Sequence, residues 1–229
     1  MTTHEERIEN MIATGRVSRE EGERLRAAID PEHAPAKPLA KLLDPVAHLS
    51  TPAALIASAA IAACGVVLGA TLGIRFDGAL DAHVGGPPVS VLTAVLEQVL
   101  AWPLVALVAY GAARIAGAKT DTRPVDMLSA VGLARLPLVL SGVLSLLLMP
   151  KLPPGADADT AIKTLTEGAG LVRTLVAAGL TLPLVVFFFV LLVRGYRTAS
   201  GLSGARLAVS ALGFIVVAEV ISKVVLMSL

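Results

Sequence analysis

Five long apolar stretches alternate with short polar segments along the chain. They cover residues 52–74, 89–115, 127–149, 171–193 and 207–229. At 1.5 Å per residue, each stretch is long enough for a helix to cross a hydrocarbon core about 30 Å thick. Lipid offers no partner to backbone amides and carbonyls, so stretches of this length are expected to be helices. The pattern therefore predicts an all-α, polytopic membrane protein with five transmembrane helices in contact with the lipid bilayer.

The first 36 residues are mostly polar and contain the start and end signals of two short helices. Thr3 with Glu6 and Ser18 with Glu21 are suited to capping boxes at the starts of the two helices, and Gly15 is suited to the end of the first helix. The apolar positions of this arm are Ile8, Ile12, Val17, Leu25 and Ile29. A pair of helices this small buries little apolar surface. We therefore expect the arm to bind a protein partner or a second copy of itself; an arm that is merely solvated is the alternative.

A proline-spaced linker, with Pro31, Pro35 and Pro38, follows the arm. Apolar residues then recur near helical spacing over residues 38–49, which predicts a short helix lying on the membrane surface and made irregular by Pro45. The expected domains are therefore a helical hairpin with its linker, residues 1–36, and a transmembrane domain, residues 37–229.

Composition and charge agree with this organisation. Charged residues make up 16% of the chain and hydrophobic residues 55%, whereas a soluble domain carries about 25% charge. The net charge of +1 gives no electrostatic basis for binding nucleic acid. The densely charged first 30 residues lack the apolar core of a cleavable signal peptide.

Lysine and arginine are more frequent on one side of the predicted transmembrane domain. That side holds the segment before the first span, the loop after the second, and the loop between the fourth and fifth. Its basic residues are Lys37, Lys41, Arg114, Lys119, Arg123, Arg194, Arg197 and Arg206. By the positive-inside rule this side faces the cytoplasm. We expect a cytoplasmic N-terminus and a C-terminus outside.

Polar side chains inside the predicted spans are costly and are the first place to look for function. They are Glu97, Gln98, Arg135, Glu219 and Lys223. Distances counted from the span ends place Glu97 and Arg135 at similar depths, and Lys223 lies one helical turn from Glu219. We expect two ion pairs, Glu97 with Arg135 and Glu219 with Lys223, that fix the helix arrangement. A proton or ion relay is the alternative interpretation of this polar network.

Small residues recur every four positions in the first span, at Gly65, Gly69 and Gly73. Such spacing lets another helix approach closely. We expect that helix to belong to the same chain, with a dimer interface as the alternative.

Signatures of catalysis and metal binding are missing from the sequence. The four histidines lie outside the spans and never stand at metal-ligand spacing with a carboxylate or with Cys64, the one cysteine. No zinc-protease, nucleophile-elbow or phosphate-loop motif occurs. We expect no metal, no cofactor and no enzymatic activity.

The third span opens with Asp126-Met-Leu-Ser-Ala-Val-Gly132 and continues to Pro137. Asp126, Gly132 and Pro137 resemble the Asp-x-Leu start and the Gly-Tyr-x-x-x-Pro segment of the Yip1 family, with Leu133 in place of the usual tyrosine. The five spans and the N-terminal arm are also similar to that family, over about residues 40–229. The resemblance implies a five-helix bundle without enzymatic activity.

The segment from Ile12 to Glu21 resembles the short helical hairpins of the SHOCT kind that are attached to many bacterial membrane proteins. With the Ala/Leu/Val-rich spans, this resemblance implies a multi-pass protein of the bacterial inner membrane. Our first hypothesis is an interaction or membrane-organising protein whose cytoplasmic arm recruits a partner. The second is a small transporter or channel component that uses Glu97, Arg135 and Glu219.

Overall fold

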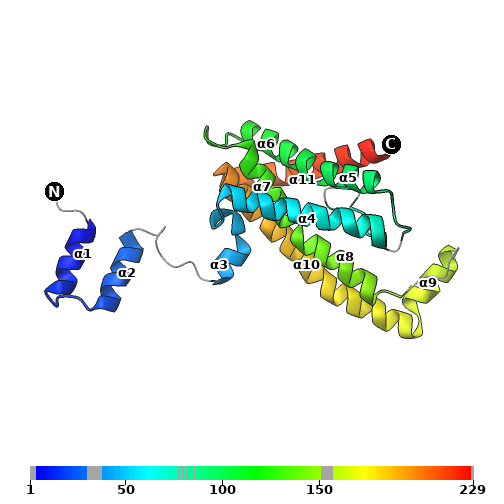
Figure 1. Cartoon of the computed structure of the whole chain (residues 1–229), viewed down its shortest axis with the longest axis horizontal. Helices are drawn as coiled ribbons and strands as arrows, with labels where there is room; N and C mark the ends of the chain where they lie inside the picture. Colours follow the sequence, from blue (N-terminus) through cyan, green and yellow to red (C-terminus); the bar gives the residue numbers. More distant parts are fainter. Residues whose placement is uncertain are drawn as a thin grey trace. The chain divides into compact units, whose positions relative to one another are not determined.

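The structure is a computed structural model that describes residues 4–29, 38–76, 78, 80, 82–84, 86–150 and 157–227. The chain divides into two compact units, Met1–Leu42 and Leu43–Leu229. The first unit contains α1 (His4–Ala13) and α2 (Arg19–Ile29), which pack against each other, and most of α3 (Pro38–Leu43) (Figure 1).

The turn between α1 and α2 follows the sequence prediction closely. Gly15 adopts a left-handed conformation, with φ of 67°, just after α1. The backbone N–H and the hydroxyl of Ser18 both donate to the Glu21 carboxylate at 2.9 Å, and the Glu21 N–H donates to Ser18 Oγ at 3.2 Å. These bonds confirm the second capping box, and the two that Ser18 donates to the carboxylate lower the pKa of Glu21 below its usual value. Thr3 of the first capping box lies outside the described residues.

Apolar side chains of the hairpin divide into a buried and an exposed set. Ile8 is buried, and Gly22 of α2 lies so close to Ile12 that a Cβ there would collide with it. Leu25 is exposed, and Val17 is half-buried. The side chain of Ile29 is outside the described part. Of the apolar side chains predicted for the arm, some thus pack inside the hairpin and others remain exposed.

The second unit is a helical bundle. Its elements are η1 (Pro45–Ala47), α4 (Thr51–Leu72), α5 (Val91–Val99), η2 (Leu100–Leu104), α6 (Val105–Ile115), α7 (Pro124–Ala134), α8 (Leu136–Leu148), α9 (Ala158–Thr166), α10 (Gly168–Ser200) and α11 (Gly204–Met227). Within the described residues, five helical segments are long and apolar enough to cross a membrane: Thr51–Leu72, Val91–Ile115, Pro124–Leu148, Gly168–Ser200 and Gly204–Val225. They confirm the predicted all-α membrane fold and its five spans.

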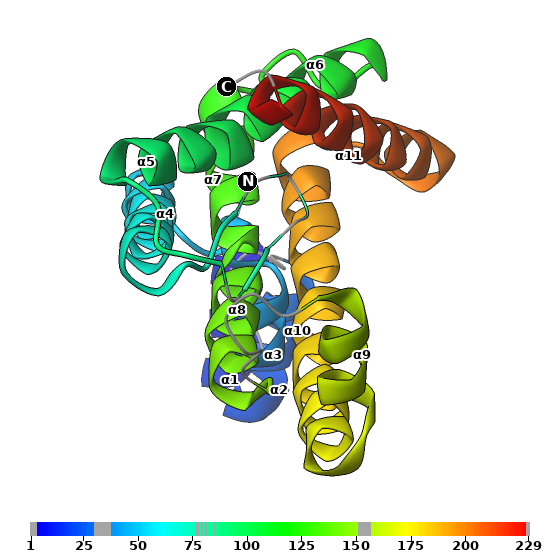
Figure 2. The ribbon, with the colours of Figure 1, turned by 90° about the vertical axis from the view of Figure 1, so that its right-hand side faces the viewer.

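The third span, α7 with α8, forms the centre of the bundle. It packs against α4 on one side and against α10 on the other, while α6 packs on α7 and on the peripheral α11 (Figure 2). The largest buried side chains of this core are Met127, Phe188, Leu192, Tyr196 and Phe214. The rings of Tyr196 and Phe214 lie 4.7 Å apart between centroids. The central position explains why the third span is the most buried of the five.

Prolines interrupt two of the spans. Pro103 lies in η2, a π-helical turn between α5 and α6, and Pro137 lies in the first turn of α8, directly after the break at Arg135. A proline lacks the N–H that would continue the helical ladder, so the helix must deviate at these positions. Pro45 has a related effect: the predicted helix over residues 38–49 is split into α3 and η1, with Asp44 capping the second piece.

Helix α9 was not predicted, because residues 150–170 have the composition of a loop. Asp157 begins this helix, and its Oδ1 accepts the Thr160 N–H at 2.8 Å. Hydrogen bonding to the side chain and then to the backbone of Thr160 lowers the pKa of Asp157. The fourth span is also longer than predicted. It continues to Ser200 and ends at Gly201, which is left-handed with φ of 67°.

Candidate functional site: the intramembrane carboxylates

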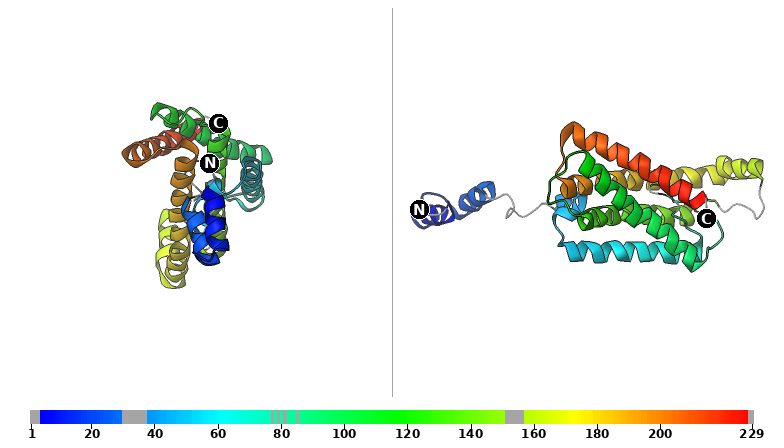
Figure 3. Two further views of the ribbon diagram at one scale, coloured as in Figure 1. Left: turned by 90° about the vertical axis from the view of Figure 1, so that its left-hand side faces the viewer. Right: turned by 90° about the horizontal axis from the view of Figure 1, so that it is seen from above.

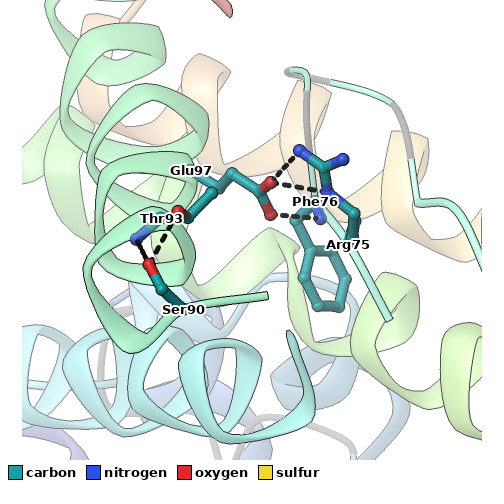
Figure 4. Close-up of polar contacts among 5 residues, drawn as sticks. All are labelled: Arg75, Phe76, Ser90, Thr93 and Glu97. Atoms are coloured by element: carbon teal, nitrogen blue, oxygen red, sulfur yellow. Dashed lines mark hydrogen bonds and ion pairs between the residues drawn. The ribbon is translucent and has the colours of Figure 1, made fainter. Parts of the chain in front are cut away.

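Glu97 is buried in α5 and binds the segment that follows α4. The start of α5 is fixed by Ser90, whose hydroxyl accepts the Thr93 N–H at 3.1 Å. Two turns later, Glu97 Oε1 accepts from Arg75 Nε at 2.8 Å and also from Arg75 Nη2 (Figure 4). Its other oxygen, Oε2, accepts the Phe76 N–H at 3.4 Å. The carboxylate therefore faces the loop between α4 and α5, residues 73–90, hereafter the α4–α5 loop.

The predicted pairing of Glu97 with Arg135 is wrong, because the α4–α5 loop folds back into the bundle. Gly73 ends α4 in a left-handed conformation with φ of 65°. Beyond it, Ile74 and Phe76 are buried against Val139 of α8, and this carries Arg75 towards α5. Depth counted from the span ends could not anticipate a loop that returns into the bundle.

Arg135 lies at the break between α7 and α8 and is 2% exposed. Its Nη1 donates to the carbonyl of Ala101 in η2 at 2.9 Å, so it joins the two proline-interrupted spans. Its guanidinium carbon lies 5.6 Å from the centroid of the Phe76 ring, which is within the range of a cation–π contact. Nη2 has no hydrogen-bond partner among the described residues.

Glu219 of α11 makes the predicted contact with Lys223 and one that was not predicted. The ion pair with Lys223 measures 4.0 Å, which confirms the pairing. The other carboxylate oxygen, Oε2, accepts the Leu80 N–H of the α4–α5 loop at 3.0 Å. Both intramembrane carboxylates thus bind backbone or side-chain donors of the same loop.

The glycine ladder of α4 packs against α5 of the same chain. A Cβ at Gly65 would collide with the side chain of Gln98, which is buried, and a Cβ at Gly69 would lie 3.3 Å from Ala94 Cβ. Gly73 belongs to the end of the helix, where its positive φ is required. The contacts agree with the expected intrachain packing, and the missing side chain of Gly65 leaves the space that Gln98 fills.

The three residues of the family-like motif have distinct places around α7. Asp126 binds Arg123 at the start of the helix, with an ion pair of 2.8 Å that raises the pKa of Arg123. Gly132 lies so close to Ser58 of α4 and to Trp102 of η2 that a Cβ would collide with Ser58. Pro137 is buried at the start of α8. The motif thus marks the start of the third span, a close contact with α4 and the break within the span.

Arg75, Phe76 and Leu80 are the contributors to this site that sequence reasoning missed. The available signal was the apolar Ile74 and Phe76 flanking Arg75 at the end of a span, in a segment otherwise rich in glycine and proline.

Elsewhere, a cavity of about 230 Å³ beside Asp126 is lined by residues of both charges, Lys119 and Asp121 among them, and favours no single ligand. Within the described residues, no three metal-ligating side chains come together.

The fold and these contacts define a multi-pass α-helical membrane protein in which two carboxylates of the spans, Glu97 and Glu219, bind the protein's own loop. The family model described as the Yip1 domain matches residues 34–226, which is most of the chain. The chain therefore belongs to the Yip1 domain family, as the motif in the third span predicted. Neither a curated protein nor a solved structure matches it.

Proposed function

We propose that this chain is a non-enzymatic membrane protein whose N-terminal arm recruits a protein partner, or a second copy, to the bundle. The observation that carries the proposal is the engagement of Glu97 and Glu219 by the α4–α5 loop. A proton or ion relay needs carboxylates that can exchange partners, whereas these two accept hydrogen bonds from the chain itself. The intramembrane charges then serve the architecture, and recruitment falls to the arm.

The arm has features suited to binding. Its turn is fixed by the Ser18–Glu21 capping box and by the close contact of Gly22 with Ile12, so a partner meets a formed hairpin. Leu25, on α2, is exposed and offers an apolar contact. In our proposal the arm lies in the cytoplasm of a bacterium and the C-terminus lies outside. Arg114, Lys119 and Arg206 support this orientation, because basic loops are retained on the cytoplasmic side of the membrane.

A transporter or channel component is the second candidate, and one observation favours it. Arg135 keeps one donor, Nη2, without a described partner, at the point where two interrupted helices meet. Ionisable side chains within spans mark solute pathways in transport proteins, and the half-helices of broken spans bind anionic groups there. Arg135→Met keeps the volume of the side chain but removes its charge, so it separates this function from recruitment.

The experiment compares three forms of the protein expressed at equal levels in native membranes: the full chain, the chain lacking residues 1–36, and Arg135→Met. Each is purified in mild detergent, and bound proteins are quantified by mass spectrometry. We expect at least one partner, or the second copy, to be retained by the full chain and by Arg135→Met and lost with the arm. Equal recovery of every partner without the arm would refute recruitment by the arm.

A further inference from the structure

An apolar groove opens between the end of α6 and the start of α11. The two helices are in contact, and these ends lie apart in Figure 2 and in the left view of Figure 3. The groove has a volume of about 490 Å³, and its lining includes Ile115, Val209, Gly213 and Phe214. Phe214 is buried and forms part of its floor, whereas Ile115 is 91% exposed at its edge. The groove belongs to the surface that a spanning bundle presents to lipid.

The shape of the groove suits a flexible apolar chain. A Cβ placed on Gly213 would meet no atom within 4 Å, so the space above this glycine is open. The one uncharged polar side chain of the lining, Ser210, already donates to the Arg206 carbonyl at 2.7 Å. Burying this lining against hydrocarbon therefore leaves no hydroxyl without a partner.

Positive charge stands at one end of the groove. Arg206, in the first turn of α11, is exposed and lines the groove itself. Arg114 directly precedes Ile115 in the last turn of α6 and donates to the Lys119 carbonyl at 3.2 Å. Asp121, on the α6–α7 connection, and Asp126, in the first turn of α7, do not line the groove, and Asp126 is bound to Arg123. An apolar groove ending at a guanidinium complements a lipid with a negatively charged headgroup.

We propose that this groove binds one anionic phospholipid of the adjacent leaflet, with an acyl chain over Gly213 and Phe214 and the phosphate at Arg206. This site does not depend on the arm or on the intramembrane carboxylates, so it stands apart from the recruitment proposed above. It gives the bundle a preference for the lipid at its basic end, where the positive charges also orient the protein.

The test uses the full chain, delipidated in detergent, with phosphatidylglycerol or phosphatidylcholine of identical acyl chains. Native mass spectrometry measures the fraction of protein with one bound lipid. We expect phosphatidylglycerol to bind more tightly than phosphatidylcholine, and Arg206→Gln to weaken its binding by about fivefold. Arg194→Gln, an exposed arginine on α10 outside the groove, is the matched control and should leave binding unchanged.

A second pair of variants tests the apolar part of the groove. Gly213→Phe fills the open space and should reduce binding of both lipids, whereas Gly179→Phe, at an equally open position on α10, should not. Equal binding of the two lipids with no effect of Arg206→Gln would overturn the proposal in favour of nonselective solvation. A dimer that Gly213→Phe dissociates, with lipid binding unchanged, would overturn it in favour of a second copy.

Discussion

Replacing Arg75 should destabilise the bundle more than replacing its partner Glu97. The carboxylate of Glu97 is only 2% exposed, whereas the Arg75 side chain is 38% exposed. Arg75→Leu leaves a buried carboxylate without its cation. Glu97→Leu leaves an arginine that can turn towards water. The two single substitutions in this ion pair should therefore lower the free energy of unfolding by different amounts.

The magnitudes follow from this difference in exposure. Removing one partner of a buried pair costs about 3–5 kcal/mol of unfolding free energy. For Arg75→Leu we expect the low end, about 3 kcal/mol, because the Phe76 N–H still donates a hydrogen bond to Glu97. Exposed pairs contribute about 0–1 kcal/mol, and the Phe76 N–H loses an acceptor, so Glu97→Leu should cost about 1–2 kcal/mol. The double variant should recover part of the larger loss.

The assay is the free energy of unfolding of the full chain in mixed micelles, measured for both single variants and the double variant. A second double-mutant cycle, which combines Glu97→Leu with Arg135→Leu, is the matched control. It should show a much smaller coupling energy, because the side chains of Glu97 and Arg135 are not paired. Coupling confined to the Glu97 and Arg135 cycle, or a larger loss from Glu97→Leu than from Arg75→Leu, would refute the reasoning.

Other predictions concern close packing and the arm. Gly132→Ala forces a Cβ onto Ser58 and should cost about 1–3 kcal/mol of unfolding free energy, whereas Gly111→Ala, where a Cβ meets nothing within 4 Å, should cost little; equal losses would contradict the packing. The lowered pKa of Glu21 means that its capping contribution is complete above the unfolded value of about 4.3 and is lost as the pH falls through the lower folded value. An NMR titration of the Glu21 carboxyl in the full chain should therefore give a midpoint below that of a glutamate in an unfolded peptide, and Ser18→Ala should move the midpoint back towards the unfolded value.

Much of the fold was predictable because hydrocarbon imposes a simple rule on sequence. A span needs about 20 apolar residues, so the five helices are visible in the chain, and the residues that end them, such as Gly73 and Gly201, have the expected chemistry. The Ser18–Glu21 capping box and the Glu219–Lys223 pair were also predictable, since both are local contacts fixed by helical spacing.

The partners of Glu97 and Arg135 were not predictable, because they depend on contacts between segments distant in sequence. The pairing of Glu97 with Arg75 requires the loop to return into the bundle. That return depends on the burial of Ile74 and Phe76 against α8 and has no periodic signature. Arg135 instead meets the carbonyl of Ala101, which is presented in a π-helical turn. Sequence patterns predict which residues lie deep, and tertiary packing decides what they bind.

Hydrogen exchange of the α4–α5 loop, measured on the full chain in lipid nanodiscs, tests most directly the claim that Glu97 and Glu219 hold this loop. The amides of Phe76 and Leu80 donate to Glu97 and Glu219, so both should exchange slowly. Glu219→Leu should remove the protection of Leu80, and Glu97→Leu that of Phe76. Exchange of both amides at the rate of an unprotected peptide in the unaltered protein would contradict the account.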